Sequence, residues 1–306
     1  MNKHTPHDAT AIFQYEGIPA ANQLVPLGLQ HVVAAVVGIV TPSILVANTC
    51  GIEGADRTLL IQVSLLVTAL ATLLQLFPIF GRIGSRLPVI MGISFAYVPT
   101  MQAIAGEFGV GTILGAQIIG GIVAIFVGLF VKQIRRFFPP LITGTVVFTI
   151  GLSLYPTAIN YMAGGTSSET YGSWENWAVA IFTLVIVTVL NHFGKGIVKL
   201  ASILIGMLAG YVVSAFFGMV SFSSVAAASV FQFPQVMHFG INFEVSSCVA
   251  IGLLFAINSV QAIGDFTATT VGGLGREPSD KELQGGIVGY GIMNIIGAAF
   301  GGLPTA

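Results

Sequence analysis

The polar residues that could do chemistry are concentrated in one long apolar run, residues 246–271. Asn258, Gln261 and Asp265 lie within this run, and Gln261 and Asp265 are four residues apart, so a helix would place both on one face. Asp265 is the only acidic residue well inside a predicted apolar segment. A carboxyl group in a low-dielectric environment can bind and release a proton during a transport cycle. The pattern favours proton coupling, and the alternative is a structural Asp265 that caps the N-terminus of a neighbouring helix.

A second candidate stretch, Ser94, Phe95 and Ala96, lies between the helix breakers Gly92 and Pro99. A helix interrupted within a membrane exposes backbone N–H and C=O groups that can bind a polar ligand. The Phe95 ring could stack on a planar ligand, or it could be an ordinary core side chain. The stretch is therefore a candidate substrate site.

The first apolar segment begins with two further polar residues, Gln30 and His31. Near the membrane surface both could simply be hydrated, or His31 could donate a hydrogen bond into a buried network. The sequence contains no phosphate-binding loop, nucleophile elbow or metal-ligand motif, so we expect no cofactor, no metal and no enzyme activity.

Composition places the chain in the membrane class. Hydrophobic residues make up 55% of the sequence and charged residues only 8%, and the mean hydropathy is +0.91. Soluble domains carry about 25% charged residues. The net charge of −1 provides no attraction to nucleic acid.

We predict nine transmembrane segments, because an apolar helix of about 20 residues spans the hydrocarbon core. If the N-terminus is cytoplasmic, Arg57 is the only one of the 11 Lys and Arg residues that falls on the outer side. This asymmetry is what the positive-inside rule requires of a multi-pass protein of the cell membrane. The predicted segments are 27–50, 59–80, 88–105, 110–131, 139–155, 177–192, 200–220, 246–271 and 285–300.

An internal repeat is suggested by two similar segment ends. The second segment is followed by Leu87-Pro88 and the ninth by Leu303-Pro304, an offset of 303 − 87 = 216 residues, although a common dipeptide can also recur by chance. A unit of seven spans would make the repeat inverted, as in many secondary transporters. The second half of the site would then lie beyond Ala306. The expected regions are a cytoplasmic N-terminal segment (1–26), the first seven-helix repeat (27–220), an extracellular connection (221–245) and the start of the second repeat (246–306).

Several motifs resemble the nucleobase–ascorbate transporter family, also called nucleobase:cation symporter 2. Among its members, the chain looks most similar to bacterial xanthine and uric acid permeases. The similarity extends over nearly the whole chain in family order. Its motifs are LQHVVA (29–34), LPVIMGISFA (87–96), FFPPLITG (137–144), NYMAGG (160–165), SVQAIGD (259–265) and GLPTA (302–306).

The resemblance implies an all-α polytopic protein with fourteen helices in two inverted sevens, homodimers, and proton-driven import of a purine nucleobase. Phe95 would stack on the base, Gln261 would hydrogen-bond its ring edge, and His31 would bond near Ser94. The implied substrate-binding residues are Phe95, Gln261, Ser94 and Ala96, and the coupling or supporting residues are Asp265, His31, Gln30 and Asn258.

Two positions depart from the family pattern. Gln261 stands where a glutamate is expected, and an amide can read a purine edge but cannot bind a coupling proton. Tyr290 stands where xanthine permeases often carry an aspartate. The coupling cation, proton or sodium, therefore stays open. The alternatives are a uracil or other nucleobase/ascorbate-type symporter, an anion transporter with the same fold, or a receptor that binds without transport.

Overall fold

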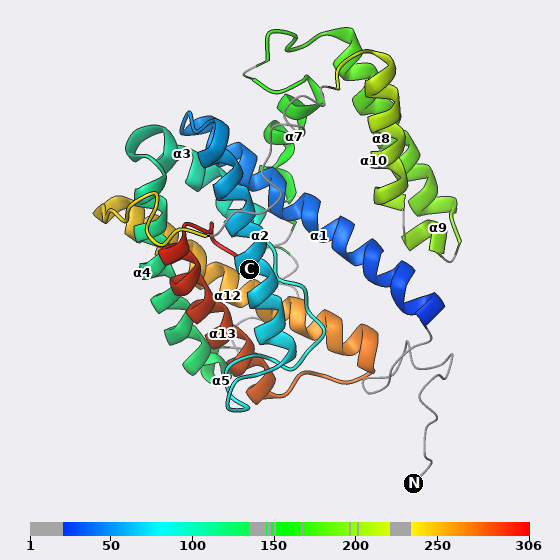
Figure 1. Cartoon of the computed structure of the whole chain (residues 1–306). Coiled ribbons are helices and arrows are strands. Elements are labelled where there is room, and N and C mark those ends of the chain that lie inside the picture. The colour runs from blue at the N-terminus through cyan, green and yellow to red at the C-terminus, as the bar shows by residue number, and fades with distance from the viewer. Residues whose placement is uncertain are drawn as a thin grey trace. The chain divides into compact units, whose positions relative to one another are not determined.

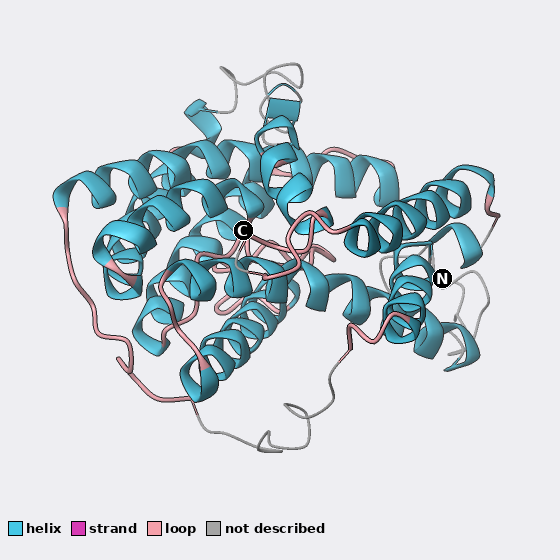
Figure 2. Ribbon diagram, turned by 90° about the horizontal axis from the view of Figure 1, so that it is seen from above, coloured by secondary structure: helices cyan, strands magenta, loops and turns pink. Residues whose placement is uncertain are grey.

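The computed structural model describes residues 21–134, 145, 148–149, 151–166, 168–195, 197–200, 202–220 and 234–306. The elements in these ranges are helices, joined by turns and loops (Figure 2). The chain divides into two compact units, the first formed by Met1–Val25, Ala35–Ile150 and Phe233–Ala306, and the second by Pro26–Ala34 and Gly151–Gln232.

Most of the long helices lie in the first unit (Figure 1). The helix α1 (Ala21–Thr49) contributes residues to both units. The other helices of the first unit are α2 (Gly54–Leu76), the short 3-10 helix η2 (Phe95–Tyr97), α3 (Val98–Phe108), α4 (Val110–Leu129), α5 (Val131–Ile134), α12 (Val245–Leu274) and α13 (Asp280–Phe300).

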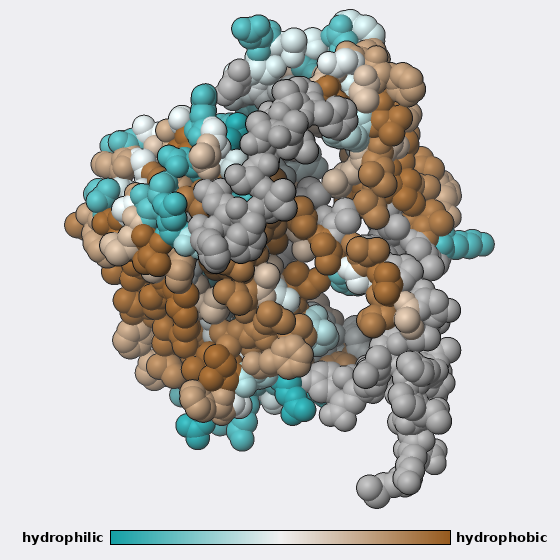
Figure 3. Space-filling view, in the orientation of Figure 1, coloured by the Kyte–Doolittle hydropathy of each residue, from teal (hydrophilic) through white to brown (hydrophobic). Residues whose placement is uncertain are grey.

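Five helices, α2, α4, α12, α13 and α8 (Trp174–Phe193), are long and apolar enough to cross a membrane. In Figure 3 an apolar surface covers the sides of the first unit and polar residues gather at its two ends. Exposed Val249 and Leu253 on α12 and Phe126 on α4 contribute to this surface. The chain is thus an all-α, multi-pass membrane protein, as its composition predicts.

The remaining predicted segments are shorter or only partly described. The seventh corresponds to α10 (Ser202–Phe216), which has 15 residues. The third is not one continuous helix, because its helical part begins only at Phe95. Most of the fifth, residues 139–155, lies outside the described residues.

The core of the first unit is built around α4, which packs against both α12 and α13. The axes of α4 and α13 approach closely where Gly121 faces Gly291. A Cβ atom at Gly121 would lie 2.7 Å from the Gly291 carbonyl oxygen, and a Cβ atom at Gly291 would lie 2.6 Å from the Gly121 oxygen. Glycine therefore permits a contact between two helix backbones, as small residues do in membranes.

The helices α2 and α13 run in opposite directions. Near the end of α2, Gln75 Nε2 donates to the Gly286 carbonyl oxygen at the start of α13 (2.9 Å). Nearer the beginning of α2, Ser64 Oγ accepts a hydrogen bond from the Leu303 N–H just after α13 (3.4 Å). Both side chains are buried. Opposite directions are what an inverted repeat requires of these two helices.

Polar caps define the starts of α12 and α13. The Glu244 carboxylate accepts hydrogen bonds from the Ser246 hydroxyl and from the backbone N–H groups of Ser246 and Ser247, and these bonds lower the pKa of Glu244 to about 2. The start of α13 is a capping box formed by Ser279 and Glu282. Arg276 pairs with Glu282 at 2.6 Å, which ties the preceding turn to this helix start.

The second unit contains α7 (Tyr155–Met162), α8, α9 (Ile197–Leu200) and α10. Helices α8 and α10 pack against each other. The loop before α8 is held by Asn176, whose Nδ2 donates to the carbonyl oxygens of Ala163 (3.0 Å) and Thr170 (2.7 Å).

Candidate functional site

The first part of the candidate site is the interrupted third segment. After α2 the chain continues without an α-helix until η2, and α3 follows directly. Ser94 is the N-cap of η2, and its Oγ accepts a hydrogen bond from the Ala96 N–H (3.4 Å). Ser94, Phe95 and Ala96 are all half-buried. The helix break predicted between Gly92 and Pro99 is therefore present, and it lies just before Phe95.

A second extended stretch, residues 302–306, pairs with this break. Gly92 N–H donates to the Ala306 oxygen (3.0 Å), and Ala306 N–H donates to the Gly92 oxygen (2.8 Å). Next to this pair, Ile93 and Thr305 form an antiparallel bridge. The stretch after Leu87-Pro88 and the stretch that contains Leu303-Pro304 thus lie side by side.

Asn294 of α13 holds the second stretch in place. Its Nδ2 donates to the carbonyl oxygens of Thr305 (3.0 Å) and Tyr290 (2.9 Å), and its Oδ1 accepts from the Thr305 N–H (2.9 Å). Gln117 of α4 donates to Asn294 Oδ1 (3.2 Å). The side chains of Asn294, Gln117 and Thr305 are fully buried. One side chain therefore replaces the helical hydrogen bonds that the extended backbone does not make.

Replacing Asn294 with leucine should destabilise the protein strongly. Several buried polar groups would lose a partner at once, and each such loss costs about 1–3 kcal/mol. We expect a large fall in the thermal unfolding midpoint of the full-length protein in nanodiscs. Asn48→Leu is the matched control, because Asn48 is exposed near the end of α1. Equal midpoints for the two variants would show that the Asn294 bonds do not hold the extended stretch.

A buried aromatic cluster lies beside the break. The hydroxyls of Tyr97 and Tyr290 are hydrogen-bonded to each other, and Asn258 Nδ2 donates to the Tyr290 hydroxyl (3.4 Å). The Phe255 ring lies 4.9 Å from the Tyr97 ring and 5.4 Å from the Tyr290 ring, centroid to centroid. The cluster fixes the end of η2 against α12 and α13.

Three polar residues on α12 lead from this cluster to the surface of the first unit. Asn258 is 4% exposed, Gln261 is half-buried, and Asp265 is exposed. Gln261 and Asp265 lie about one helical turn apart on the same face of α12. Gln261 Oε1 is buried and has no hydrogen-bond partner among the described residues. It shares this state with side-chain oxygen atoms of Gln62, Gln117 and Ser247, but only Gln261 is also a predicted site residue. A bound ligand with an N–H group would satisfy its Oε1.

The structure brings most of the predicted site residues into one region. Phe95, the first residue of η2, packs against the core, and η2 contacts α12, which carries Asn258, Gln261 and Asp265. His31 belongs to the second unit and is exposed, so its expected bond near Ser94 stays a prediction. The side chain of Gln30 lies outside the described residues.

Sequence reasoning missed the network of Gln117, Asn294 and Thr305. The signal was present, because Gln117 and Asn294 are polar residues inside predicted apolar segments, and each such residue is a functional candidate. The bonds of Tyr290 were missed too, since only its departure from the family pattern was noted. These residues extend the site into α4 and α13.

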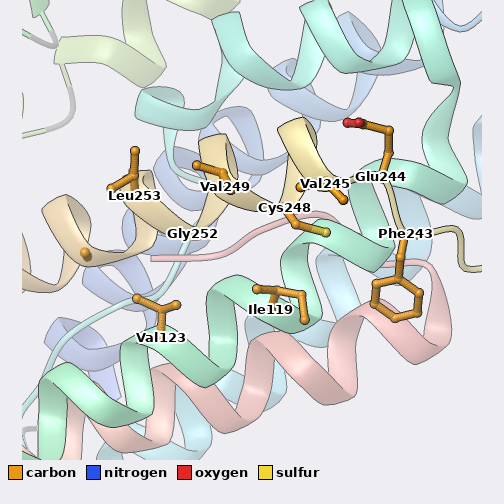
Figure 4. Close-up of a pocket in the computed structure, with 10 residues that line it drawn as sticks. Ile119, Val123, Phe243, Glu244, Val245, Cys248, Val249, Gly252 and Leu253 are labelled. Atoms are coloured by element: carbon orange, nitrogen blue, oxygen red, sulfur yellow. The ribbon is translucent and has the colours of Figure 1, made fainter.

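An apolar groove of about 540 Å³ lies between α4 and α12 (Figure 4). Ile119 and Val123 line one side, and Val249 and Leu253 line the other. Glu244 lies at one end, with its carboxylate turned away from the groove and toward its own helix start. The groove thus lacks the polar groups that would orient a nucleobase, so the candidate site is the region around the break. In the part of the chain that the structure describes, no group of His, Cys, Asp or Glu could hold a metal ion.

Comparison with known proteins connects this geometry to a family. A xanthine permease of Bacillus subtilis is 36% identical over 281 residues, 91% of this chain. A uric acid permease of the same organism, PucJ, is 37% identical over 286 residues, and a nucleobase transporter of Paenibacillus larvae is 33% identical over 291 residues. The chain spans 63% of the length of the first two relatives and 65% of the third.

The family match covers nearly the whole chain. It runs over residues 22–306, which include the interrupted stretch, the α12 face and the second extended stretch. These relatives are transporters and not enzymes, as the sequence predicted. The chain therefore belongs to the Permease family.

Proposed function

We propose that this protein is a secondary active transporter that imports a purine nucleobase, xanthine or uric acid, across the cytoplasmic membrane by proton symport. The observation that carries the proposal is the buried, unpartnered Oε1 of Gln261 on the helix that η2 contacts. The names of the relatives, xanthine, uric acid and nucleobase transporters, support the substrate class.

The binding mode follows from the groups around the break. The half-buried Phe95 ring offers a flat apolar surface for a planar base. Gln261 Oε1 can accept a hydrogen bond from a ring N–H, and its Nε2 can donate to a ring carbonyl or nitrogen. Ser94 and Ala96 contribute backbone groups next to the base. Buried polar groups that require partners discriminate strongly against compounds that lack them.

Proton coupling is assigned to Asp265 in this proposal. It is the only carboxyl group on α12, and Gln261 cannot bind a proton. Because Asp265 lies about one helical turn from Gln261 on the same face of α12, its charge state can influence the amide that reads the base. Asn258 supports this face through its bond to Tyr290.

Topology, an internal repeat and the oligomeric state complete the proposal. The distribution of Lys and Arg favours a cytoplasmic N-terminus. The antiparallel α2 and α13 and the paired extended stretches support an inverted seven-helix repeat. In this proposal residues 27–220 are the first repeat and residues 246–306 are the start of the second repeat. His31 is kept as a supporting residue, and a homodimer is expected from the family resemblance.

Uptake by the full-length protein in proteoliposomes tests the proposal. Labelled xanthine should accumulate when an inward proton gradient is imposed, and unlabelled urate should compete better than uracil or ascorbate. Uptake driven equally well by a sodium gradient alone would reject proton symport. Binding of xanthine without uptake would favour a receptor, and competition by uracil alone would favour a uracil transporter.

Gln261→Glu should preserve purine recognition and change the pH dependence of uptake, because a carboxyl group at this position adds a second proton-binding site. Gln261→Leu should weaken xanthine binding about tenfold or more, because both hydrogen bonds to the base are lost. Gln102→Glu is the control, since Gln102 lies on α3 and its bond to Thr49 is at the surface. Uptake should be measured across pH for the three variants. An unchanged pH profile for Gln261→Glu would show that residue 261 takes no part in proton coupling.

A further inference from the structure

A loop that the proposed site does not use crosses one end of the first unit. Residues 234–242, called the strap here, precede α12 and contact the ends of three helices. The Met237 N–H donates to the Ala299 oxygen of α13 (2.8 Å), and the Asn242 N–H donates to the Gly111 oxygen of α4 (3.0 Å). His238 Nε2 lies 2.8 Å from Asp56 Oδ1 in the first turn of α2.

Both ring nitrogens of His238 face oxygen atoms that can only accept. Nε2 is paired with the Asp56 carboxylate, and Nδ1 lies 2.7 Å from Gln235 Oε1. A neutral imidazole carries one N–H, so it can satisfy only one of these oxygens, whereas the imidazolium ion carries two. We infer that His238 is a proton-binding site whose protonated form fastens the strap to α2.

The surrounding charges are consistent with a bound proton. Asp56 is the acidic partner from α2, and Glu53 and Arg57 flank it in sequence. The last turn of α13 and the first turn of α4 carry no ionisable side chain, and neither does the rest of the strap. Glu244 follows the strap, and its carboxylate is bound to the start of α12. The strap histidine thus has one charged partner among the described residues that contact it.

Loss of the proton would loosen the strap at one point. One ring nitrogen would then present a lone pair to an acceptor oxygen, and the ion pair with Asp56 would be lost. The effect would reach the second extended stretch, because the Phe239 ring lies against Gly301, and Gly301 immediately precedes residues 302–306. A Cβ atom at Gly301 would lie 2.8 Å from this ring, so the strap packs closely against the end of α13 at this point.

Hydrogen exchange of the full-length protein in nanodiscs tests the inference without relying on transport. Protection factors, which are corrected for the intrinsic effect of pH, should be measured for the Met237 and Asn242 amides between about pH 5.5 and pH 8, where histidine changes charge. Because the His238 and Asp56 side chains are 28% and 57% exposed, we expect protection to fall only about two- to fivefold toward the higher pH. The Gly84 amide, which donates to the Gly285 oxygen at 2.8 Å elsewhere in the unit, should stay constant.

Three variants separate a proton-binding site from a structural contact. His238→Gln can still donate to Asp56 but cannot titrate, so protection should become independent of pH. Asp56→Asn should also remove the dependence. Glu53→Gln is the matched control, because it makes the same charge change at the start of α2 while Asp56 is kept, and its pH dependence should equal that of the parent protein.

The protonation state can also be read directly. Nitrogen-15 chemical shifts of the His238 ring should show both nitrogens protonated at a pH where the strap amides are protected. A neutral ring at that pH, with Nδ1 accepting from a Gln235 amide turned the other way, would overturn the inference. So would strap protection that does not depend on pH in the parent protein. Because neither readout involves a substrate, failure here would leave the proposed transport function unaffected.

Discussion

Gly291→Ala is expected to lower the thermal stability of the protein, although alanine usually stabilises a helix interior relative to glycine by about 1 kcal/mol. The new Cβ atom would lie 2.6 Å from the carbonyl oxygen of Gly121. That oxygen belongs to the backbone of α4, so it cannot move aside as a flexible side chain would. The helices must separate, and overpacking of this kind costs about 1–3 kcal/mol.

Thermal unfolding of the full-length protein in nanodiscs checks this result. The control is Gly272→Ala in α12, because a Cβ atom there meets nothing within 4 Å. Its unfolding midpoint should stay equal or rise slightly. Gly121→Ala should behave like Gly291→Ala, and the double variant should lose less than the sum of the two, because both substitutions strain the same crossing. A midpoint for Gly291→Ala equal to that of Gly272→Ala would contradict the close approach of α4 and α13.

The features that local sequence determines were predictable. Apolar segments of the required length predicted five helices that the structure contains, because a membrane demands long apolar runs. Gly92 and Pro99 predicted the helix break before Phe95, because both residues disfavour a continuous helix. The four-residue spacing of Gln261 and Asp265 predicted that both lie on one face of a helix, and the structure places both in the continuous helix α12.

The features that depend on distant contacts were not predictable. Tyr97 and Tyr290 are 193 residues apart, and Gln117 and Asn294 are 177 residues apart, so no local sequence pattern predicts either hydrogen bond. The same applies to His238 and Asp56, which are 182 residues apart. Each pair joins elements whose neighbours are set by the packing of the whole unit. A polar residue in an apolar segment can thus be flagged from sequence, but its partner requires the fold.

This distinction bears on Asp265, whose role in coupling rests on its position and not on any contact with a distant element. Asp265→Asn is expected to abolish accumulation of xanthine against a gradient, with a loss of about tenfold or more. Asparagine has nearly the same shape and keeps a hydrogen-bond acceptor, but it cannot exchange a proton. Insertion and purine binding should therefore survive, and exchange of labelled for unlabelled xanthine should continue.

The comparison of accumulation with exchange makes this test specific. Loss of both would indicate a damaged binding site, whereas loss of accumulation alone would indicate lost coupling. Asp280→Asn is the matched control, because it removes a carboxyl group from the exposed first turn of α13, and it should accumulate xanthine normally. Normal accumulation by Asp265→Asn would show that this carboxyl group does not couple transport to the proton gradient. Since Gln261 cannot bind a proton, the coupling group would then have to be sought outside α12.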